Sequence, residues 1–168
     1  DIPHLCYSDG LRADGNCRAC DVEIEGERAL APSCCRQPTE GMVVYSNHAR
    51  ARKSQTLVMA LLKTDVGEAK FTGTSELDQW CNRLNVGPSR FASRNQPVAD
   101  ISHPAIAVNL EACIQCTRCL RACREEQAND VIGFAHRGAH VEIVFDLGDP
   151  MGESSCVGCG ECVQACPT

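Results

Sequence analysis

Cysteine is the residue whose number and spacing could do chemistry in this sequence. Fourteen of the 168 residues are cysteines, and most follow one another with at most three residues between them. Thiolates grouped this closely suit an inorganic centre, because one metal–sulfur cluster needs several sulfur ligands close together. Twelve of the cysteines are therefore interpreted as ligands of one [2Fe–2S] cluster and two [4Fe–4S] clusters.

Eight of these cysteines form two runs with the same spacing, C-x2-C-x2-C-x3-C, at residues 113–123 and 156–166. In ferredoxins of the bacterial type, three cysteines of each run bind one cluster and the fourth binds the other cluster. The reason is the limited reach of one loop. Three thiolates in a tight loop bind three irons of a cubic cluster, and the fourth iron faces away, toward a cysteine that follows the other loop. The predicted sets are Cys113, Cys116, Cys119 and Cys166 for the first [4Fe–4S] cluster, and Cys123, Cys156, Cys159 and Cys162 for the second.

Four further cysteines, with the spacing C-x10-C-x2-C-x13-C, predict the [2Fe–2S] site; they are Cys6, Cys17, Cys20 and Cys34. A C-x-x-C pair with a distant fourth cysteine is typical of plant-type [2Fe–2S] sites, although the first gap there is four residues. Cys35 follows Cys34 directly, and adjacent side chains point in different directions. Cys34 is therefore the predicted ligand, whereas Cys35 and the isolated Cys81 are expected to be buried thiols.

Two other uses of cysteine compete with iron–sulfur clusters. Disulfide bridges are disfavoured because no signal peptide precedes the cysteines and because the tight spacing does not suit bridges between distant segments. The thiols must then stay reduced, which predicts a cytoplasmic protein. A zinc-binding scaffold stays open as an alternative, since zinc also accepts four thiolates, although zinc sites usually contain separate C-x-x-C pairs.

Charge and motif content narrow the function further. The formal net charge of −6 disfavours nucleic acid as a partner, because phosphates repel an acidic chain. No apolar stretch is long enough to cross a membrane as a helix. The sequence also lacks a dinucleotide-binding glycine loop, a phosphate-binding loop and a nucleophile–base set, so no catalytic residue is predicted. One-electron transfer is the chemistry that remains.

The cysteine groups divide the sequence into three predicted parts, residues 1–46, 47–104 and 105–168, and the predicted fold class is α+β. Alternation of polar and apolar residues indicates short strands in the first and third parts. The predicted strands are residues 21–25, 28–31, 131–135 and 140–145.

The middle part is predicted to be a helical spacer followed by a linker. Asn47 is the expected cap of a first helix that ends near residues 65–67. A second helix is expected from Ser75 to Leu84, and the proline-containing residues 87–104 are predicted to be irregular. The apolar face of the first helix is predicted to be Leu57, Val58, Leu61 and Leu62.

Charged and small residues accompany the two cysteine runs. Gly158 and Gly160 would let the backbone approach a cluster closely. Arg118, Arg121 and Arg124 lie beside the first run. Their side chains have two open interpretations, ordinary solvated charge or a positive field that offsets the negative charge of a cluster.

Several stretches resemble the electron-input arm shared by the large iron–sulfur subunit of complex I, [FeFe] hydrogenases and molybdenum- or tungsten-dependent formate dehydrogenases. Within that group, the sequence resembles the alpha subunit of NAD-dependent formate dehydrogenase. The stretches that carry the resemblance are residues 2–6, 14–20, 31–36, 112–125, 129–133 and 156–167.

This resemblance implies a fold, cofactors and partners. The first part would be a β-grasp [2Fe–2S] domain whose opening hairpin is missing, and the last a two-[4Fe–4S] ferredoxin domain. A molybdopterin domain, with bis-molybdopterin guanine dinucleotide and Mo or W, would follow the segment. FMN and NAD would bind to a flavin-bearing iron–sulfur partner subunit. The alternative is the relay arm of an [FeFe] hydrogenase or of a complex I-like NADH dehydrogenase.

The sequence departs from this pattern in the middle part. Many relatives carry a [4Fe–4S] site there with one histidine and three cysteine ligands, whereas this sequence offers Cys81 and His103. That cluster is predicted to be absent, and the remaining histidines are interpreted as ordinary surface or core residues. Because the hairpin and the molybdopterin domain are missing, the sequence is expected to be a piece of a longer polypeptide.

Overall fold

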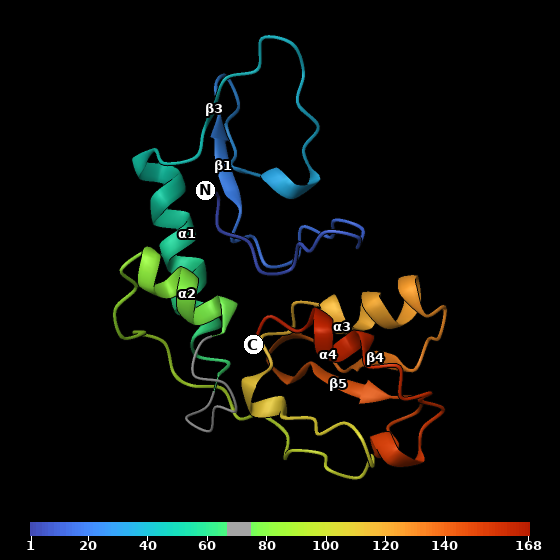
Figure 1. Ribbon diagram of the computed structural model, residues 1–168. Helices are drawn as coiled ribbons and strands as arrows, with labels where there is room; N and C mark the ends of the chain where they lie inside the picture. The colour runs from blue at the N-terminus through green and yellow to red at the C-terminus, as the bar shows by residue number, and fades with distance from the viewer. Residues whose placement is uncertain (67–74) are drawn as a thin grey trace.

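The computed structural model describes residues 1–66 and 75–168. A small sheet and two helices form one half of the molecule, and a hairpin with short helices forms the other (Figure 1). The arrangement is α+β, as predicted. Within the described ranges, no helix is both long and apolar enough to cross a membrane.

The N-terminal sheet has three short strands, β1 (Asp21–Ile24), β2 (Ala31–Pro32) and β3 (Val44–Tyr45), in the order β2-β1-β3. Both neighbours run antiparallel to β1. The predicted second strand is shorter than expected and shifted toward its end, because Pro32 pairs with Asp21. The sequence did not predict β3, since two residues are too few to show an alternating pattern.

Helix α1 (Ala49–Leu62) follows β3 and packs against β1. Its N-cap is His48, without a side-chain cap bond, so the prediction of Asn47 was wrong by one residue. The helix ends at Leu62, before the predicted residues 65–67, of which residue 67 lies outside the described part.

The buried face of α1 also differs from the prediction. Ala51, Gln55 and Met59 are the buried residues, whereas Leu61 is 47% exposed. Gln55 is tolerated in the core because its Nε2 donates to the carbonyl oxygen of Asp21 at 2.9 Å, which joins the helix to the sheet. Leucine spacing alone could not show this, since a polar residue with buried partners took a position in the core.

Helix α2 (Glu76–Arg83) agrees with the prediction. The backbone N–H of Asp78 donates to the hydroxyl of Ser75, which caps the helix. Leu77 and Cys81 form its buried face. Residues 87–104 are irregular as predicted, apart from an isolated bridge between Asp100 and Val108.

The C-terminal half is built on a hairpin. Strands β4 (Ile132–Ala135) and β5 (Glu142–Phe145) pair antiparallel, which confirms the two predicted strands. Helices α3 (Arg118–Arg121) and α4 (Glu161–Ala165) follow the cysteine loops and pack against each other. The other helical turns are 3-10 turns at Ser33–Cys35, Leu110–Ala112, Gly138–His140 and Met151–Glu153, and a π turn at Ala122–Glu126.

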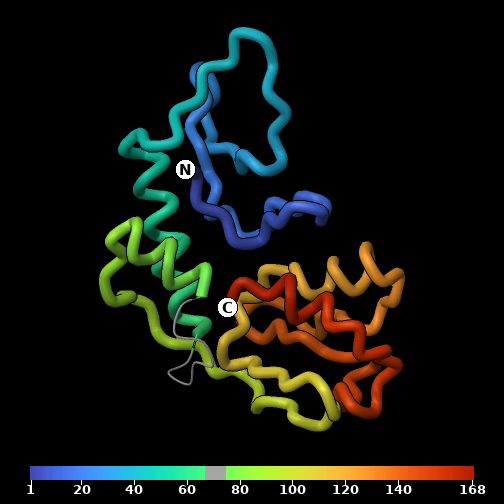
Figure 2. The backbone as a smooth tube through the Cα atoms, viewed as in Figure 1, coloured from blue at the N-terminus to red at the C-terminus, as the bar shows by residue number. Residues whose placement is uncertain are grey.

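One buried core joins all three parts predicted from the sequence. It contains Leu5 from the first part, Met59 and Leu77 from the two spacer helices, and Ile114 and Cys116 from the first cysteine run. The C-terminus also reaches the spacer, because the carbonyl oxygen of Pro167 accepts from the N–H of Glu76 at 2.9 Å (Figure 2). The cysteine groups are therefore fixed relative to each other by shared packing.

Candidate metal centres

The two cysteine runs fold into loops of the same shape. Two residues after the first cysteine, Gln115 and Gly158 both have a left-handed backbone, with φ of 55° and 67°. Each of their N–H groups donates to the sulfur of that first cysteine at 3.4 Å. The next left-handed positions are Thr117 and Gly160, one residue after the second cysteine. The loop geometry therefore comes from the spacing of the run and does not require glycine.

Each loop opens onto a cavity, and each cavity takes cysteines from both runs. The larger has a volume of about 290 Å³ and mostly apolar walls, including Ile106, Ile132 and Phe145. The other has a volume of about 20 Å³ and shares those three residues. The larger cavity is lined by Cys113, Cys116, Cys119, Cys162 and Cys166, and the smaller by Cys123, Cys156, Cys159 and Cys162. The structure thus brings each predicted [4Fe–4S] set to one place.

The first three thiols of the first run, which line the larger cavity, have raised pKa values. Burial raises the pKa of Cys116 to about 12, and it raises the pKa values of Cys113 and Cys119 in the same way. Neighbouring thiolates, among them Cys166, add to the shift because like charges repel. Thiols in this setting stay protonated unless a metal centre compensates their charge, so cluster binding would release protons.

The smaller cavity is lined by both buried and exposed cysteines. Burial raises the pKa of Cys162, with further contributions from Cys156, Cys159 and Cys123. Cys159 itself is exposed. The thiol of Cys123 donates to the carbonyl oxygen of Asn129 at 2.7 Å, which ties the first run to the start of the hairpin.

A segment of the irregular linker holds the second loop in place. The carboxylate of Asp100 accepts from the N–H of Met151 at 2.7 Å, and the hydroxyl of Ser102 accepts from the N–H of Gly152 at 2.8 Å. A side chain at position 152 would clash with the backbone carbonyl of Ser102, so glycine is required by this contact. The ring of His103 lies within van der Waals distance of the Cβ position of Gly158.

The four cysteines near the N-terminus form two contacting pairs. The backbone N–H of Cys6 donates to the sulfur of Cys17 at 3.4 Å, and the N–H of Cys17 donates to the sulfur of Cys6 at the same distance. The thiol of Cys17 also hydrogen-bonds to Cys6 and lowers its pKa to about 6. Burial, followed by a hydrogen bond with Cys20, raises the pKa of Cys34. The predicted [2Fe–2S] set therefore lies in one neighbourhood.

The two remaining cysteines have different surroundings. Cys81 is 5% exposed in the core, as predicted. Cys35 is exposed, so the prediction of a buried thiol was wrong. The 3-10 turn at Ser33–Cys35 turns its side chain toward the loop at Gly15, and its sulfur lies 3.7 Å from that of Cys34.

Two of the three arginines beside the first run are buried. Arg118 is 6% exposed and pairs with Glu76 at 2.8 Å, while Arg121 is 3% exposed. Arg124 is exposed and pairs with Asp130. Solvated charge is therefore the wrong interpretation for Arg118 and Arg121. Only the tertiary structure shows this, because burial comes from the N-terminal loop that covers α3 (Figure 1).

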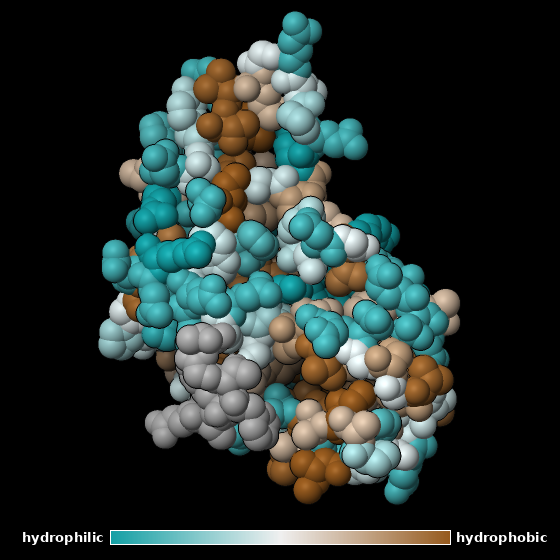
Figure 3. Space-filling view, in the orientation of Figure 1, coloured by the Kyte–Doolittle hydropathy of each residue, from teal (hydrophilic) through white to brown (hydrophobic). Residues whose placement is uncertain are grey.

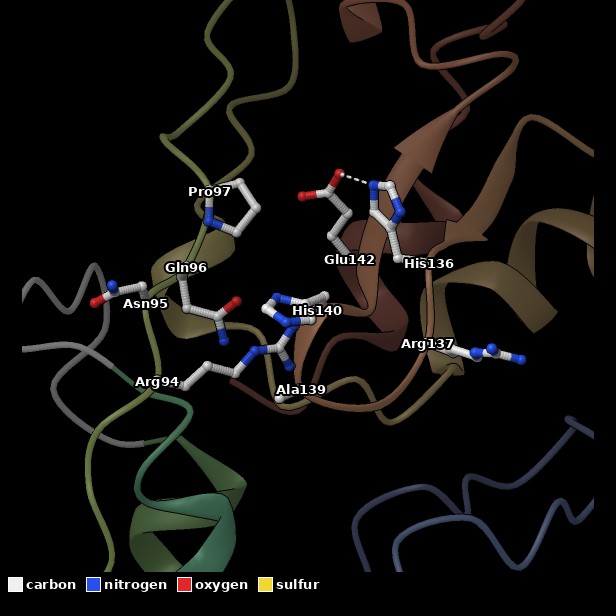
Figure 4. Close-up of a pocket in the computed structure, with 9 residues that line it drawn as sticks. All are labelled: Arg94, Asn95, Gln96, Pro97, His136, Arg137, Ala139, His140 and Glu142. Carbon is white, nitrogen blue, oxygen red and sulfur yellow. Dashed lines mark ion pairs between the residues drawn. The ribbon is translucent and has the colours of Figure 1, made fainter.

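A broad cleft of about 870 Å³ lies between the linker and the β4–β5 hairpin (Figure 4). Arg94 and Gln96 line one side, and His136, His140 and Glu142 line the other. Gln96 Nε2 donates to the carbonyl oxygen of Cys113 at 2.9 Å, and Arg94 donates to the carbonyl oxygen of Val141. The linker therefore supports the first cysteine loop from this side.

The donor chemistry of the three sites fits iron–sulfur clusters. All predicted ligands are thiols, the cavities have apolar walls, and backbone N–H groups point at sulfur, which stabilises thiolate charge. Among residues 1–66 and 75–168, no three or more His, Cys, Asp or Glu side chains converge as they would around a single metal ion.

Comparison with known families identifies two iron–sulfur domain types. Residues 1–49 match the 2Fe-2S iron-sulfur cluster binding domain, and residues 105–167 match the 4Fe-4S dicluster domain. A crystal structure of an NAD+-reducing [NiFe]-hydrogenase superposes with a TM-score of 0.90 at 22% identity, over 100% of this chain and 73% of that one. At that identity the likeness shows the fold.

Similar sequences come from several oxidoreductases. The NADP-reducing hydrogenase subunit HndD of Solidesulfovibrio fructosivorans is 34% identical over 182 residues, 100% of this chain and 30% of that protein. An NADH-quinone oxidoreductase subunit from Rickettsia felis is 30% identical over 172 residues, 99% and 25% of the two chains. A putative formate dehydrogenase of Staphylococcus haemolyticus is 26% identical over 175 residues, 99% and 17%.

These findings define the class of the chain. It is an iron–sulfur electron-transfer module, homologous to the modules in the NADH-quinone oxidoreductase subunit, the HndD hydrogenase subunit and a putative formate dehydrogenase. The chain spans less than a third of the length of these three relatives. The relatives support the wider group and do not single out formate dehydrogenase.

Proposed function

We propose that this chain carries single electrons through one [2Fe–2S] cluster and two [4Fe–4S] clusters within a larger oxidoreductase complex. The observation that carries the proposal is the crossed lining of the two cavities. The larger cavity holds Cys113, Cys116 and Cys119 of the first run together with Cys166 and Cys162 of the second, and the smaller holds Cys156, Cys159 and Cys162 of the second run together with Cys123 of the first. The proposed ligands are Cys6, Cys17, Cys20 and Cys34 for [2Fe–2S], Cys113, Cys116, Cys119 and Cys166 for the first [4Fe–4S], and Cys123, Cys156, Cys159 and Cys162 for the second.

The clusters would supply reversible one-electron redox chemistry, and the chain's own residues would hold and shield them. Apolar walls exclude water, and the N–H groups of Gln115 and Gly158 stabilise thiolate sulfur. Apolar side chains gather on the C-terminal half (Figure 3), and Leu147 and Val157 are 100% and 67% exposed. Such a surface supports contact with a partner protein, which a relay needs at both ends.

Metal analysis tests this proposal. The purified protein should contain iron and acid-labile sulfide, absorb visible light, and give EPR signals of both cluster types after reduction. Colourless protein with stoichiometric zinc would contradict the proposal and support the zinc scaffold instead.

We further propose that the complex is an NAD-dependent formate dehydrogenase. Its molybdopterin domain, with Mo or W, would follow this segment, and FMN and NAD would bind to a partner subunit in the cytoplasm. The stretches that resemble the alpha subunit and the Staphylococcus haemolyticus relative support this. The alternative is a hydrogenase or a complex I-like NADH dehydrogenase, which the higher identity to HndD and to the Rickettsia felis relative favours.

The intact complex distinguishes these candidates. Formate-dependent reduction of NAD, together with molybdenum or tungsten in the sample, would support formate dehydrogenase. Hydrogen-dependent reduction of a nicotinamide nucleotide, or NADH oxidation by quinone without formate activity, would support the alternative.

A further inference from the structure

The guanidinium of Arg121 is a buried positive charge without a carboxylate partner in the described part of the chain. Its side chain is among the most enclosed of the charged residues, at 3% exposed. Three neutral oxygens accept its hydrogen bonds: Thr117 Oγ1 at 3.1 Å, the carbonyl of Arg12 at 2.5 Å and the carbonyl of Cys6. Neutral oxygens satisfy the N–H groups but leave the net charge uncompensated.

The neighbouring Arg118, by contrast, has a carboxylate partner. It donates to the carbonyl of Leu5 at 3.2 Å, in the same loop, but it also pairs with the carboxylate of Glu76 at 2.8 Å. A guanidinium does not lose its proton in proteins, so burial of Arg121 cannot be relieved by neutralisation. A buried charge is retained at low cost only when an opposite charge lies close by.

A cluster bound by the N-terminal cysteines would supply such a charge. Arg121 donates to the carbonyl oxygen of Cys6, which places the cation beside a predicted [2Fe–2S] ligand. The guanidinium therefore places a fixed positive charge beside the predicted cluster site.

We infer that Arg121 is the counter-ion of the [2Fe–2S] site and raises its reduction potential. This inference rests on the proposed function, since it requires a cluster at Cys6. Reduction adds one unit of negative charge, and a fixed cation nearby favours the more negative state. Arg121 lies on α3, two residues after Cys119, so the same side chain also fixes the N-terminal loop against the first [4Fe–4S] loop.

The test compares midpoint potentials of the [2Fe–2S] signal in EPR redox titrations of the full-length protein. Arg121→Gln should shift the potential to a more negative value, whereas Arg121→Lys, which keeps the charge, should shift it less. Arg124→Gln is the matched control, because it removes the same charge from an exposed arginine nearby and should leave the potential unchanged. Iron and sulfide content of the wild type is measured first.

The outcomes separate the two proposals. Wild-type protein without a [2Fe–2S] cluster would overturn the proposed function itself. With the cluster present, an unchanged potential in Arg121→Gln, or equal shifts in the Gln and Lys variants, would overturn the counter-ion role. Arg121→Gln could fail to assemble the cluster. Assembly in Arg121→Lys would then support the counter-ion role. Failure of both variants would overturn it, because the planar shape of the guanidinium would then matter instead of its charge.

Discussion

The N-terminal and C-terminal cysteine sites use the same ligand type in different surroundings. The N-terminal cysteines come from one continuous segment, and Cys6 and Cys17 are held by reciprocal N–H bonds to sulfur. The C-terminal cysteines come crosswise from two runs and line apolar cavities. A hydrogen bond is the first cause of the pKa shift of Cys6 at the first site, whereas burial is the first cause at Cys34 and at Cys113, Cys116 and Cys119 of the second site.

This contrast matters because surroundings set the redox properties of an iron–sulfur cluster. Hydrogen bonds to sulfur, nearby charge and solvent exposure all move the reduction potential. At the C-terminal half, burial is the first cause of the raised pKa values of Cys116 and Cys162. The same thiol chemistry is thus expected to give clusters of different potential in the two halves.

The largest expected effect tests the crossed ligand sets. Cys123→Ser should remove the second [4Fe–4S] cluster, although Cys123 belongs to the first run, because its side chain lines the smaller cavity. Iron content should fall by roughly four of about ten atoms. The EPR spectrum of this variant should match that of Cys156→Ser and differ from that of Cys113→Ser.

A different pattern of EPR spectra among these variants would contradict the crossed ligand sets. If Cys123→Ser instead matched Cys113→Ser, each run would hold its own cluster, and the two halves would no longer differ in how their ligands are assembled. Cys166→Ser is the reciprocal variant and should match Cys113→Ser.

The next effect concerns the N-terminal site. Cys34→Ser should lose the [2Fe–2S] signal and roughly two of about ten iron atoms, whereas Cys35→Ser should keep both. Although the two sulfurs lie 3.7 Å apart, only Cys34 hydrogen-bonds to Cys20. Iron analysis and EPR of the two variants decide which of the two cysteines is the ligand. Loss of the signal in Cys35→Ser alone would exchange the roles of the two residues.

Core packing should couple the two sites. Met59 is fully buried and belongs to the core that also contains Cys6 and Cys116. Met59→Ala should destabilise the protein by about 2–4 kcal/mol through the cavity it leaves. The apparent urea midpoint, followed by circular dichroism and visible absorbance, should fall for both probes together. Leu61→Ala, on the exposed side of the same helix, should change the midpoint little. Separate midpoints would mean that the halves unfold independently.

The smallest effect is expected at the linker that holds the second cysteine loop. The N–H of Met151, and then Ser102, lower the pKa of Asp100 from 3.8 by bonding to its ionised form. The stabilisation is present above pH 3.8 and is lost as the pH falls through the lower folded pKa. Asp100→Asn should cost about 1 kcal/mol at neutral pH and speed hydrogen exchange at Met151 about fivefold. Unchanged exchange would show that Ser102 alone holds the loop.

The elements that could be predicted are those whose signal is local. Helix α2 lies within the predicted range from Ser75 to Leu84, and β4 and β5 lie at the two predicted strands, of which the second shows alternating residues at Val141–Phe145. The predictions that failed depend on distant contacts. Gln55 is buried because Asp21 and Ser46 accept its hydrogen bonds, and β3 exists because β1 offers it an edge. Periodicity within one segment carries no information about such partners.

The sequence by itself determined the donor chemistry of this protein. The spacing of its cysteine runs decides which thiols a tight loop can bring together, and loop reach is a local property of the chain. Only the tertiary structure decided which charges surround those thiols. Arg121 and Arg124 stand three residues apart, and one is buried against the N-terminal loop while the other pairs with Asp130 in solvent. Burial depends on what packs from elsewhere in the chain, and it sets how strongly a charge acts on a nearby metal site.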